Sequence, residues 1–239
     1  AQEKKEPVKE PDPVIPDTPA PDAVVPDTTV PNTEKPNISS SGKEKVDAVT
    51  RLSKMSLEEK VKQMLIAGCS NIDTARSAAS SGMGGVCLYA GVFQGQNTSD
   101  VRAQMDELQN RSSIPLLIGV DEEGGKVCRV SSNPRLRATP FLSPSALYSQ
   151  GGWDLIESDT KEKAQLLLSL GINFNFAPVC DVPLSPQDYI YPRCFGLDAN
   201  LTKQYASLVV STMKGQGIGS SLKHFPGYGD NVDTHTGIA

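Results

Sequence analysis

Short apolar segments alternate with longer amphipathic segments along most of the chain, and this alternation limits the possible folds. The short segments are apolar at consecutive positions, as in GGVCLYA at 84–90 and IPLLIGV at 114–120, so both faces of each strand should be buried. Buried strands that alternate with helices predict a parallel sheet covered by helices. The expected strands are 84–90, 114–120, 172–182 and 218–224, and the expected helices are 57–67, 98–111, 153–170 and 201–214.

Two of the expected helices begin with a recognisable capping sequence. Ser56 and Glu59 have the spacing of a capping box, in which the serine caps the helix and the glutamate bonds back to its first residue. The second helix is expected to be capped by Thr98 or Ser99, because hydroxyl groups accept bonds from the free N–H groups of a first turn.

Polar and charged residues gather where three of the expected strands end. Asp121-Glu122-Glu123 follows the second strand, Asp181 lies near the end of the third, and Lys223-His224 ends the fourth. In (β/α)8 barrels the active site is built from such strand ends. A doubly wound open sheet would show the same alternation, but no GxGxxG or GxxxxGK[ST] phosphate loop follows a strand. We expect a TIM (β/α)8 barrel, truncated after about five strand–helix units where a closed barrel has eight.

The first 42 residues differ in composition from the rest of the chain. They contain nine of the eighteen prolines, no aromatic residue, eight acidic residues and four lysines, which gives this segment a charge of −4 out of −5. Such a segment cannot bury enough apolar surface to fold, and we expect a disordered, extended tether over 1–42 followed by a folded domain over 43–239. Tethers of this kind favour a secreted or cell-surface protein over a cytoplasmic one.

Composition excludes some classes of function. The pI near 5.1 gives no basic face for nucleic acid, and no apolar run has the roughly 18–20 residues that a membrane span needs. The five cysteines form no CxxC pair, so a zinc site is unsupported and mostly free, buried thiols are expected. We expect neither a metal nor a cofactor.

The chain has two histidines, His224 and His235, and both lie in one glycine-rich segment near the C-terminus. Asp233 precedes His235 by two residues, so its carboxylate can accept a hydrogen bond from the imidazole and fix its tautomer. An aspartate–histidine pair of this kind can act as a general acid and base. The alternative is that both are exposed loop residues without a catalytic role.

The segment KHFPGYG at 223–229, followed by DTH at 233–235, resembles the signature of glycoside hydrolase family 3, in its β-N-acetylglucosaminidase branch. Three upstream stretches are similar to motifs of the same family: GVDEEGGKVCR, FAPVCDV and YPRCFGLD. This sequence departs from the family pattern at Tyr228, where His or Leu is usual, and at Cys194, which replaces a serine. The spacer 230–232 has three residues where four are expected.

The resemblance implies a fold, a reaction and a set of site residues. The fold is the N-terminal barrel domain of the family, and the reaction is retaining removal of β-linked N-acetylglucosamine from cell-wall or chitin-like oligosaccharides. His235 would be the acid/base, oriented by Asp233, and the nucleophile would be an aspartate beyond Ala239. The implied substrate-binding residues are Asp121, Arg129, Arg193, Lys223 and His224.

These residue types suit an uncharged sugar that has many hydroxyl groups. Asp121 can accept bonds from two hydroxyls, while Lys223, His224 and Arg193 can donate to sugar oxygens or to an N-acetyl group. Two alternatives stay open: a phosphorylase of the same branch, and a surface protein that binds carbohydrate without cleaving it. Since part of the barrel and the nucleophile are expected elsewhere, residues 1–239 alone should be poorly stable and inactive.

Overall fold

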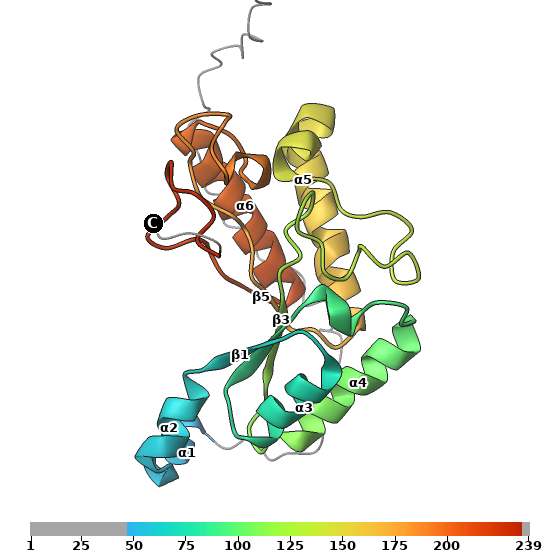
Figure 1. Ribbon diagram of the computed structural model, residues 1–239, viewed down its shortest axis with the longest axis vertical. Helices are drawn as coiled ribbons and strands as arrows, with labels where there is room; N and C mark the ends of the chain where they lie inside the picture. The colour runs from blue at the N-terminus through green and yellow to red at the C-terminus, as the bar shows by residue number, and fades with distance from the viewer. Residues whose placement is uncertain (1–46, 236–239) are drawn as a thin grey trace, which may run out of the picture. The chain divides into compact units, whose positions relative to one another are not determined.

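The computed structural model describes residues 47–235, so the expected tether over 1–42 lies outside the described residues. The described part alternates strands and helices as the sequence predicts (Figure 1). The strands are β1 (Ile66–Cys69), β2 (Gly85–Leu88), β3 (Leu117–Val120), β4 (Phe174–Asn175) and β5 (Gly219–Ser220). The helices are α1 (Ala48–Lys54), α2 (Leu57–Gln63), α3 (Ile72–Ser80), α4 (Thr98–Arg111), α5 (Pro144–Ser169) and α6 (Ala199–Gln216), with 3₁₀ turns at Ala90–Val92 and Tyr191–Arg193.

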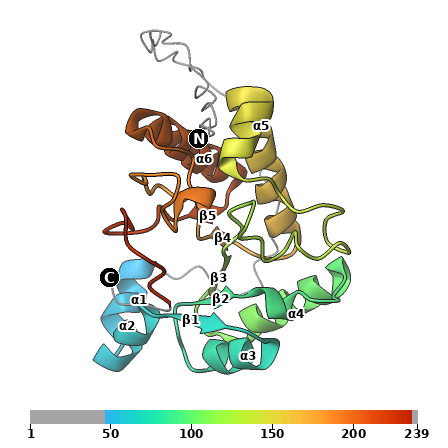
Figure 2. The same cartoon turned by 45° about the horizontal axis from the view of Figure 1, so that its top comes forward.

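The order of the strands decides between the two parallel architectures. All five strands pair in parallel, in the order β1-β2-β3-β4-β5, and Figure 2 shows them in this sequence across the sheet. A doubly wound sheet reverses its strand order at an internal switch point, whereas a (β/α)8 barrel adds each strand beside the previous one. The fold is therefore that of a TIM barrel, and the described residues supply five of its eight strands.

Helices pack in pairs beside the sheet, α3 with α4 and α5 with α6 (Figure 1). The main core joins strand residues such as Val86 and Ile118, which are fully buried, to helix residues such as Met105 and Leu167. Gly119 is required by close packing within this core, because a Cβ there would lie 2.5 Å from the Phe176 ring. Strands β2 and β3 are mostly buried, as their continuous apolar sequences predict, whereas β1 is exposed at two of its four residues and β5 is half-buried.

The structure corrects the predicted helix over 57–67. The capping box of Ser56 and Glu59 is present, but α2 ends at Gln63 and the chain enters β1 at Ile66. An apolar run of four residues cannot be assigned to a strand or to a helix by its pattern alone. The amides of Gly84 and Gly85 bond the carbonyl of Leu65, and this pairing with β2 selects the strand. Both β1 and α3 were missing from the prediction.

Other boundaries also differ from the prediction. The cap of α4 is Asn97, which accepts from the Asp100 amide, and not Thr98 or Ser99. Helix α5 consists of two helical pieces separated by a break at Gly151 and Gly152, so the predicted start at 153 matches the second piece, and the first piece, from Pro144, was not predicted. The paired parts of the last two strands, β4 and β5, are shorter than predicted.

All five cysteines are free thiols. In the described part of the chain, no helix is long and apolar enough to cross a membrane. Within residues 47–235, no three histidine, cysteine, aspartate or glutamate side chains are grouped so that they could hold a metal ion.

Candidate active site

The polar residues that follow the strands meet at one rim of the sheet. Asp121 comes directly after β3. The backbone of Lys223 pairs with the segment after β4, since its amide bonds the Pro178 carbonyl and its carbonyl accepts from the Cys180 amide. This pairing sets Asp181 beside His224. The polar residues at the ends of these strands therefore lie close together, and that they build an active site stays a prediction.

Lys223 and Arg193 share a buried carboxylate, Glu123. The Lys223 Nζ atom lies 2.7 Å from Asp121 Oδ1 and 2.5 Å from Glu123 Oε1. Arg193 donates two hydrogen bonds to the Glu123 carboxylate, from Nε at 2.9 Å and from Nη2 at 2.8 Å. The Glu123 side chain is only 2% exposed. Burial acts to lower the pKa of Arg193, but the bonds to Glu123 outweigh it and raise that pKa, so two cations and two carboxylates neutralise one another here.

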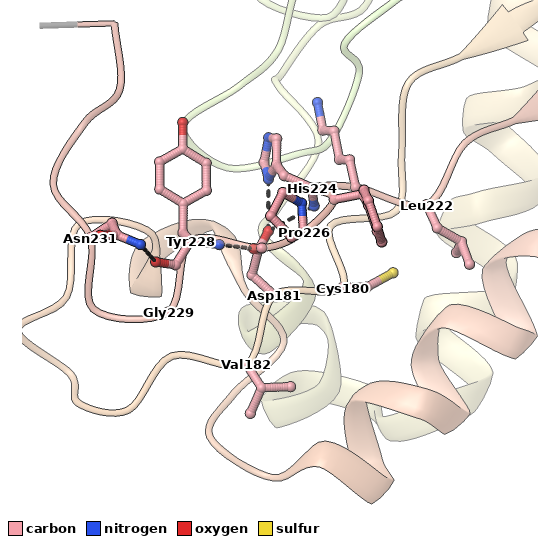
Figure 3. Close-up of a pocket in the computed structure, with 12 residues that line it drawn as sticks. Cys180, Asp181, Val182, Leu222, His224, Pro226, Tyr228, Gly229 and Asn231 are labelled. Atoms are coloured by element: carbon pink, nitrogen blue, oxygen red, sulfur yellow. Dashed lines mark hydrogen bonds and ion pairs between the residues drawn. The ribbon is translucent and has the colours of Figure 1, made fainter. Parts of the chain in front are cut away.

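A second cluster forms around Asp181, whose carboxylate is fully buried (Figure 3). It accepts from the backbone amide of His224 at 3.1 Å, from His224 Nδ1 at 2.7 Å and from the amide of Tyr228 at 2.7 Å. Burial acts to raise the pKa of Asp181, but these hydrogen bonds outweigh it and hold that pKa below its usual value. Asp181 thus fixes the turn from His224 to Tyr228 as well as the imidazole.

The hydrogen bonds of His224 assign its tautomer. Arginine can only donate, so Arg193 Nη2, which lies 3.1 Å from His224 Nε2, donates to that nitrogen. The ring proton is then on Nδ1 and points to Asp181. His224 therefore joins the two clusters into one network from Glu123 to Asp181.

The sequence marked Glu122 only as part of the polar cluster after a strand and gave it no role, yet it builds the loop that carries Arg129. Its carboxylate accepts from the backbone amides of Arg129, Val130 and Ser131, at 2.8, 2.7 and 3.2 Å. Arg129 then places its Nε atom 4.0 Å from Asp121 Oδ2. A run of amides around a fully buried carboxylate is a tertiary arrangement with no fixed sequence spacing, so the pattern EEGG alone could not reveal it.

Two further side chains near Asp121 were also missed. The Cys87 Sγ atom lies 3.7 Å from Asp121 Oδ2, and burial, together with the Asp121 charge, raises the pKa of this thiol to about 12. Tyr89 lies under the Arg129 guanidinium, whose carbon is 5.7 Å from the ring centroid. Both residues come from the end of β2, which the sequence marked as a strand without a polar cluster.

Asp233 and His235 form the pair that the sequence predicts. Asp233 Oδ1 lies 2.7 Å from His235 Nδ1 and also accepts from the His235 amide at 3.0 Å. These two bonds from His235 hold the pKa of Asp233 below its usual value. The His235 side chain is 74% exposed, so its other nitrogen, Nε2, is left for exchange of a proton with a bound molecule.

A hollow of about 510 Å³ lies beside the Asp181–His224 cluster, against the segment that follows β5, and neither Asp121 and Arg193 nor Asp233 and His235 line it (Figure 3). The structure brings together four of the predicted substrate-binding residues, Asp121, Arg193, Lys223 and His224, in one bonded network. Arg129 lies at the edge of that network. The roles given to these residues stay predictions, since geometry alone assigns no sugar contact. The hollow is lined by Cys180–Val182, Leu222–Gly229 and Asn231.

Comparison with known proteins identifies the family to which this chain is similar. Residues 56–239 match the model of the glycosyl hydrolase family 3 N terminal domain. Beta-hexosaminidase A of Pseudoalteromonas piscicida is 34% identical over 65% of this chain and 27% of its own length. A beta-hexosaminidase of Thiobacillus denitrificans is 32% identical over 70% of this chain and 46% of its own length. The chain thus spans less than half the length of these curated relatives.

Solved structures give the same result. A glycoside hydrolase family 3 beta-N-acetylglucosaminidase from Paenibacillus superposes with a TM-score of 0.67 at 30% identity, over 76% of this chain and 35% of that one. A family 3 glycosyl hydrolase from Mycobacterium smegmatis superposes with a TM-score of 0.65 at 26% identity, over 74% of this chain and 53% of that one.

Proposed function

The chain belongs to glycoside hydrolase family 3, and from this membership we propose that it is part of an enzyme that removes β-linked N-acetylglucosamine from cell-wall or chitin-like oligosaccharides. The names of the similar proteins support this reaction. The observation that carries the proposal is the Asp233–His235 pair, with 2.7 Å between Oδ1 and Nδ1.

In the proposed mechanism His235 transfers protons in both steps of a retaining reaction. Its Nε2 proton goes to the glycosidic oxygen as the bond to the leaving sugar breaks, and Nε2 later takes a proton from the incoming water. Asp233 keeps the other nitrogen protonated and stabilises the imidazolium. This use of histidine differs from the usual pair of carboxylates.

The carboxylates at the strand ends do not suit the role of nucleophile. Both oxygens of Asp181 accept hydrogen bonds, and Asp121 Oδ1 is bonded to Lys223. We therefore assign Asp121 to sugar hydroxyls, together with Lys223, His224, Arg193 and Arg129. The nucleophile is proposed to be an aspartate beyond Ala239, as the family resemblance implies.

Replacing His235 with Ala in the enzyme that contains this chain tests the proposal. With an unactivated N-acetylglucosamine disaccharide, we expect a fall in kcat of about 10²–10⁴-fold, the usual range for loss of a general acid. With a p-nitrophenyl glycoside, the rate of the first step should fall less in this variant, because the p-nitrophenolate leaving group needs no proton. Asp230→Asn, in the same loop, is the matched control and should keep its activity.

The result also separates the alternatives. A disaccharide rate that is unchanged in His235→Ala would contradict the catalytic assignment and favour a protein that only binds carbohydrate. Inorganic phosphate added to the unaltered enzyme distinguishes the second alternative: formation of N-acetylglucosamine 1-phosphate would indicate a phosphorylase, and free sugar alone a hydrolase.

We also propose that residues 1–42 tether the enzyme outside the cytoplasm. The support is their composition, with nine prolines and no aromatic residue. Fractionation of the native cells followed by immunodetection tests it, and recovery of the protein wholly in the cytoplasmic fraction would contradict it.

A further inference from the structure

Tyr228, which departs from the family pattern, has each of its polar groups bonded. Its amide donates to Asp181 at 2.7 Å. Its carbonyl accepts from Asn231 twice, from the backbone amide at 2.9 Å and from Nδ2 at 2.7 Å. Its hydroxyl lies 3.0 Å from the hydroxyl of Thr234. The residue thus starts a tight turn and also contacts the far end of the same loop.

The Tyr228 side chain is held firmly at its base. The residue is 6% exposed and belongs to a small buried cluster with Val179, Ile190 and Cys194. Its ring also meets the edge of His224, with centroids 5.0 Å apart at 85° (Figure 3). A buried aromatic ring with its hydroxyl bonded has little rotational freedom, so the oxygen that meets Thr234 has a fixed position.

Thr234 stands between Asp233 and His235 in the sequence, whereas the His235 imidazole is 74% exposed. An exposed pair of this kind loses its geometry readily unless the backbone beneath it is fixed. Tyr189 lies beside the same segment: its ring is 5.6 Å from that of Tyr228, and its side chain helps to lower the pKa of Asp233. The spacer 230–232 is also one residue shorter than the family resemblance leads us to expect.

We propose that Tyr228 is a positioning residue for the Asp233–His235 pair, and that its hydroxyl, through Thr234, holds the shortened loop so that His235 reaches the glycosidic oxygen. The inference rests on the proposed function of His235. Tyr228 itself touches no reacting atom. It links the buried Asp181–His224 pair to the exposed Asp233–His235 pair. This link holds the loop in place although its spacer is one residue shorter than expected.

The test removes one hydroxyl at a time from the enzyme that contains this chain. Tyr228→Phe and Thr234→Val should each lower kcat about three- to tenfold, the range expected for one lost hydrogen bond, with KM nearly unchanged. The double variant should fall no further than either single one, because both remove the same bond. Thr234→Ser keeps a hydroxyl and should restore most of kcat.

Tyr148→Phe is the matched control and should keep its activity. Tyr148 packs against Trp153 and Phe195 in a separate aromatic cluster. A second readout does not depend on turnover: the His235 amide should exchange its hydrogen faster in Tyr228→Phe than in the unaltered protein. Faster exchange would support the link even if His235→Ala kept full activity and so refuted the proposed function.

Three results would overturn the proposal. One is an unchanged kcat in Tyr228→Phe. Another is a loss of kcat in the double variant that equals the combined losses of Tyr228→Phe and Thr234→Val. The third is a change confined to KM, which would make Tyr228 a substrate contact and not a positioning residue.

Discussion

At the scale of single residues, Glu123 shows how a buried charge can organise a polar site. Its carboxylate bonds Arg193 twice and Lys223 once, and its own backbone carbonyl accepts from Lys163 at 3.3 Å. A carboxylate that is withdrawn from water in this way is stable only while its cations stay in place. Glu123 therefore helps to determine where the Arg193 and Lys223 side chains lie in the absence of any ligand.

Glu123→Gln keeps the shape of the side chain and removes its charge, so Lys223 keeps the ion pair with Asp121 and Arg193 loses its carboxylate partner. We expect a loss of about 3–5 kcal/mol in the free energy of unfolding, typical of a broken buried ion pair. Chemical denaturation of both proteins measures it. Glu162→Gln, which breaks the more exposed pair with Arg137, is the control and should cost about 0–1 kcal/mol. Equal losses in the two variants would contradict the assignment.

At the scale of elements, the loop after β5 is ordered by a residue that comes 43 positions earlier. Asp181 accepts from two backbone amides of this loop, those of His224 and Tyr228. Strand β5 itself pairs over only two residues, so strand pairing contributes little to holding the loop. The anionic form of Asp181 is what holds the turn.

This arrangement predicts a pH dependence. The folded-state pKa of Asp181 lies below the ordinary value of 3.8, so its contribution is complete above that value and is lost as the pH falls through the lower, folded pKa. Asp181→Asn should therefore lower stability by about 2–3 kcal/mol at pH 7, and the difference should shrink below pH 3.8. Thermal melts across this range check the prediction.

Asp106→Asn is the control for that series. Asp106 makes an exposed ion pair with Arg102, so its replacement should change the melting temperature little at any pH. A difference between Asp181→Asn and the unaltered protein that grows on acidification would contradict the argument.

At the scale of the whole molecule, the described sheet has two open edges and apolar side chains beside one of them. Among the described strands, β1 pairs only with β2, and β5 pairs only with β4. Helices α1 and α2 bury no residue, and Val49, Leu57 and Met64 are 74%, 78% and 82% exposed. Open edges and contiguous apolar surface both favour association with other chains.

Residues 1–239 produced as a separate polypeptide should therefore bind a hydrophobic dye such as ANS, self-associate and lack activity. Leu57→Gln with Met64→Gln should reduce dye binding while circular dichroism stays the same. Leu108→Gln, at a fully buried site, is the contrast and should cause unfolding. A monomer without dye binding, or turnover of a chromogenic N-acetylglucosaminide by this polypeptide alone, would contradict the prediction.

The sequence alone indicated the parallel α/β class, because short apolar runs such as 114–120 alternate with helical segments, and a covered parallel sheet buries that pattern. It also determined the Asp233–His235 pair, because two residues of separation make that contact local. Its motifs pointed to Asp121, Lys223, His224 and Arg193 as site residues. Only the tertiary structure decided three further points. These are the strand order of a barrel, the start of β1 and the tautomer of His224.

Some residues were marked by the sequence only as polar groups at strand ends, and their partners were not. Glu122, Glu123 and Asp181 act through partners that lie 7 to 70 positions away, and a spacing of that size carries no local signal. The departure at Tyr228 was visible in the sequence, but its bond to Thr234 was not. A hydrogen bond between side chains depends on how buried rings and turns direct their hydroxyl groups, and that direction is fixed only when the chain packs.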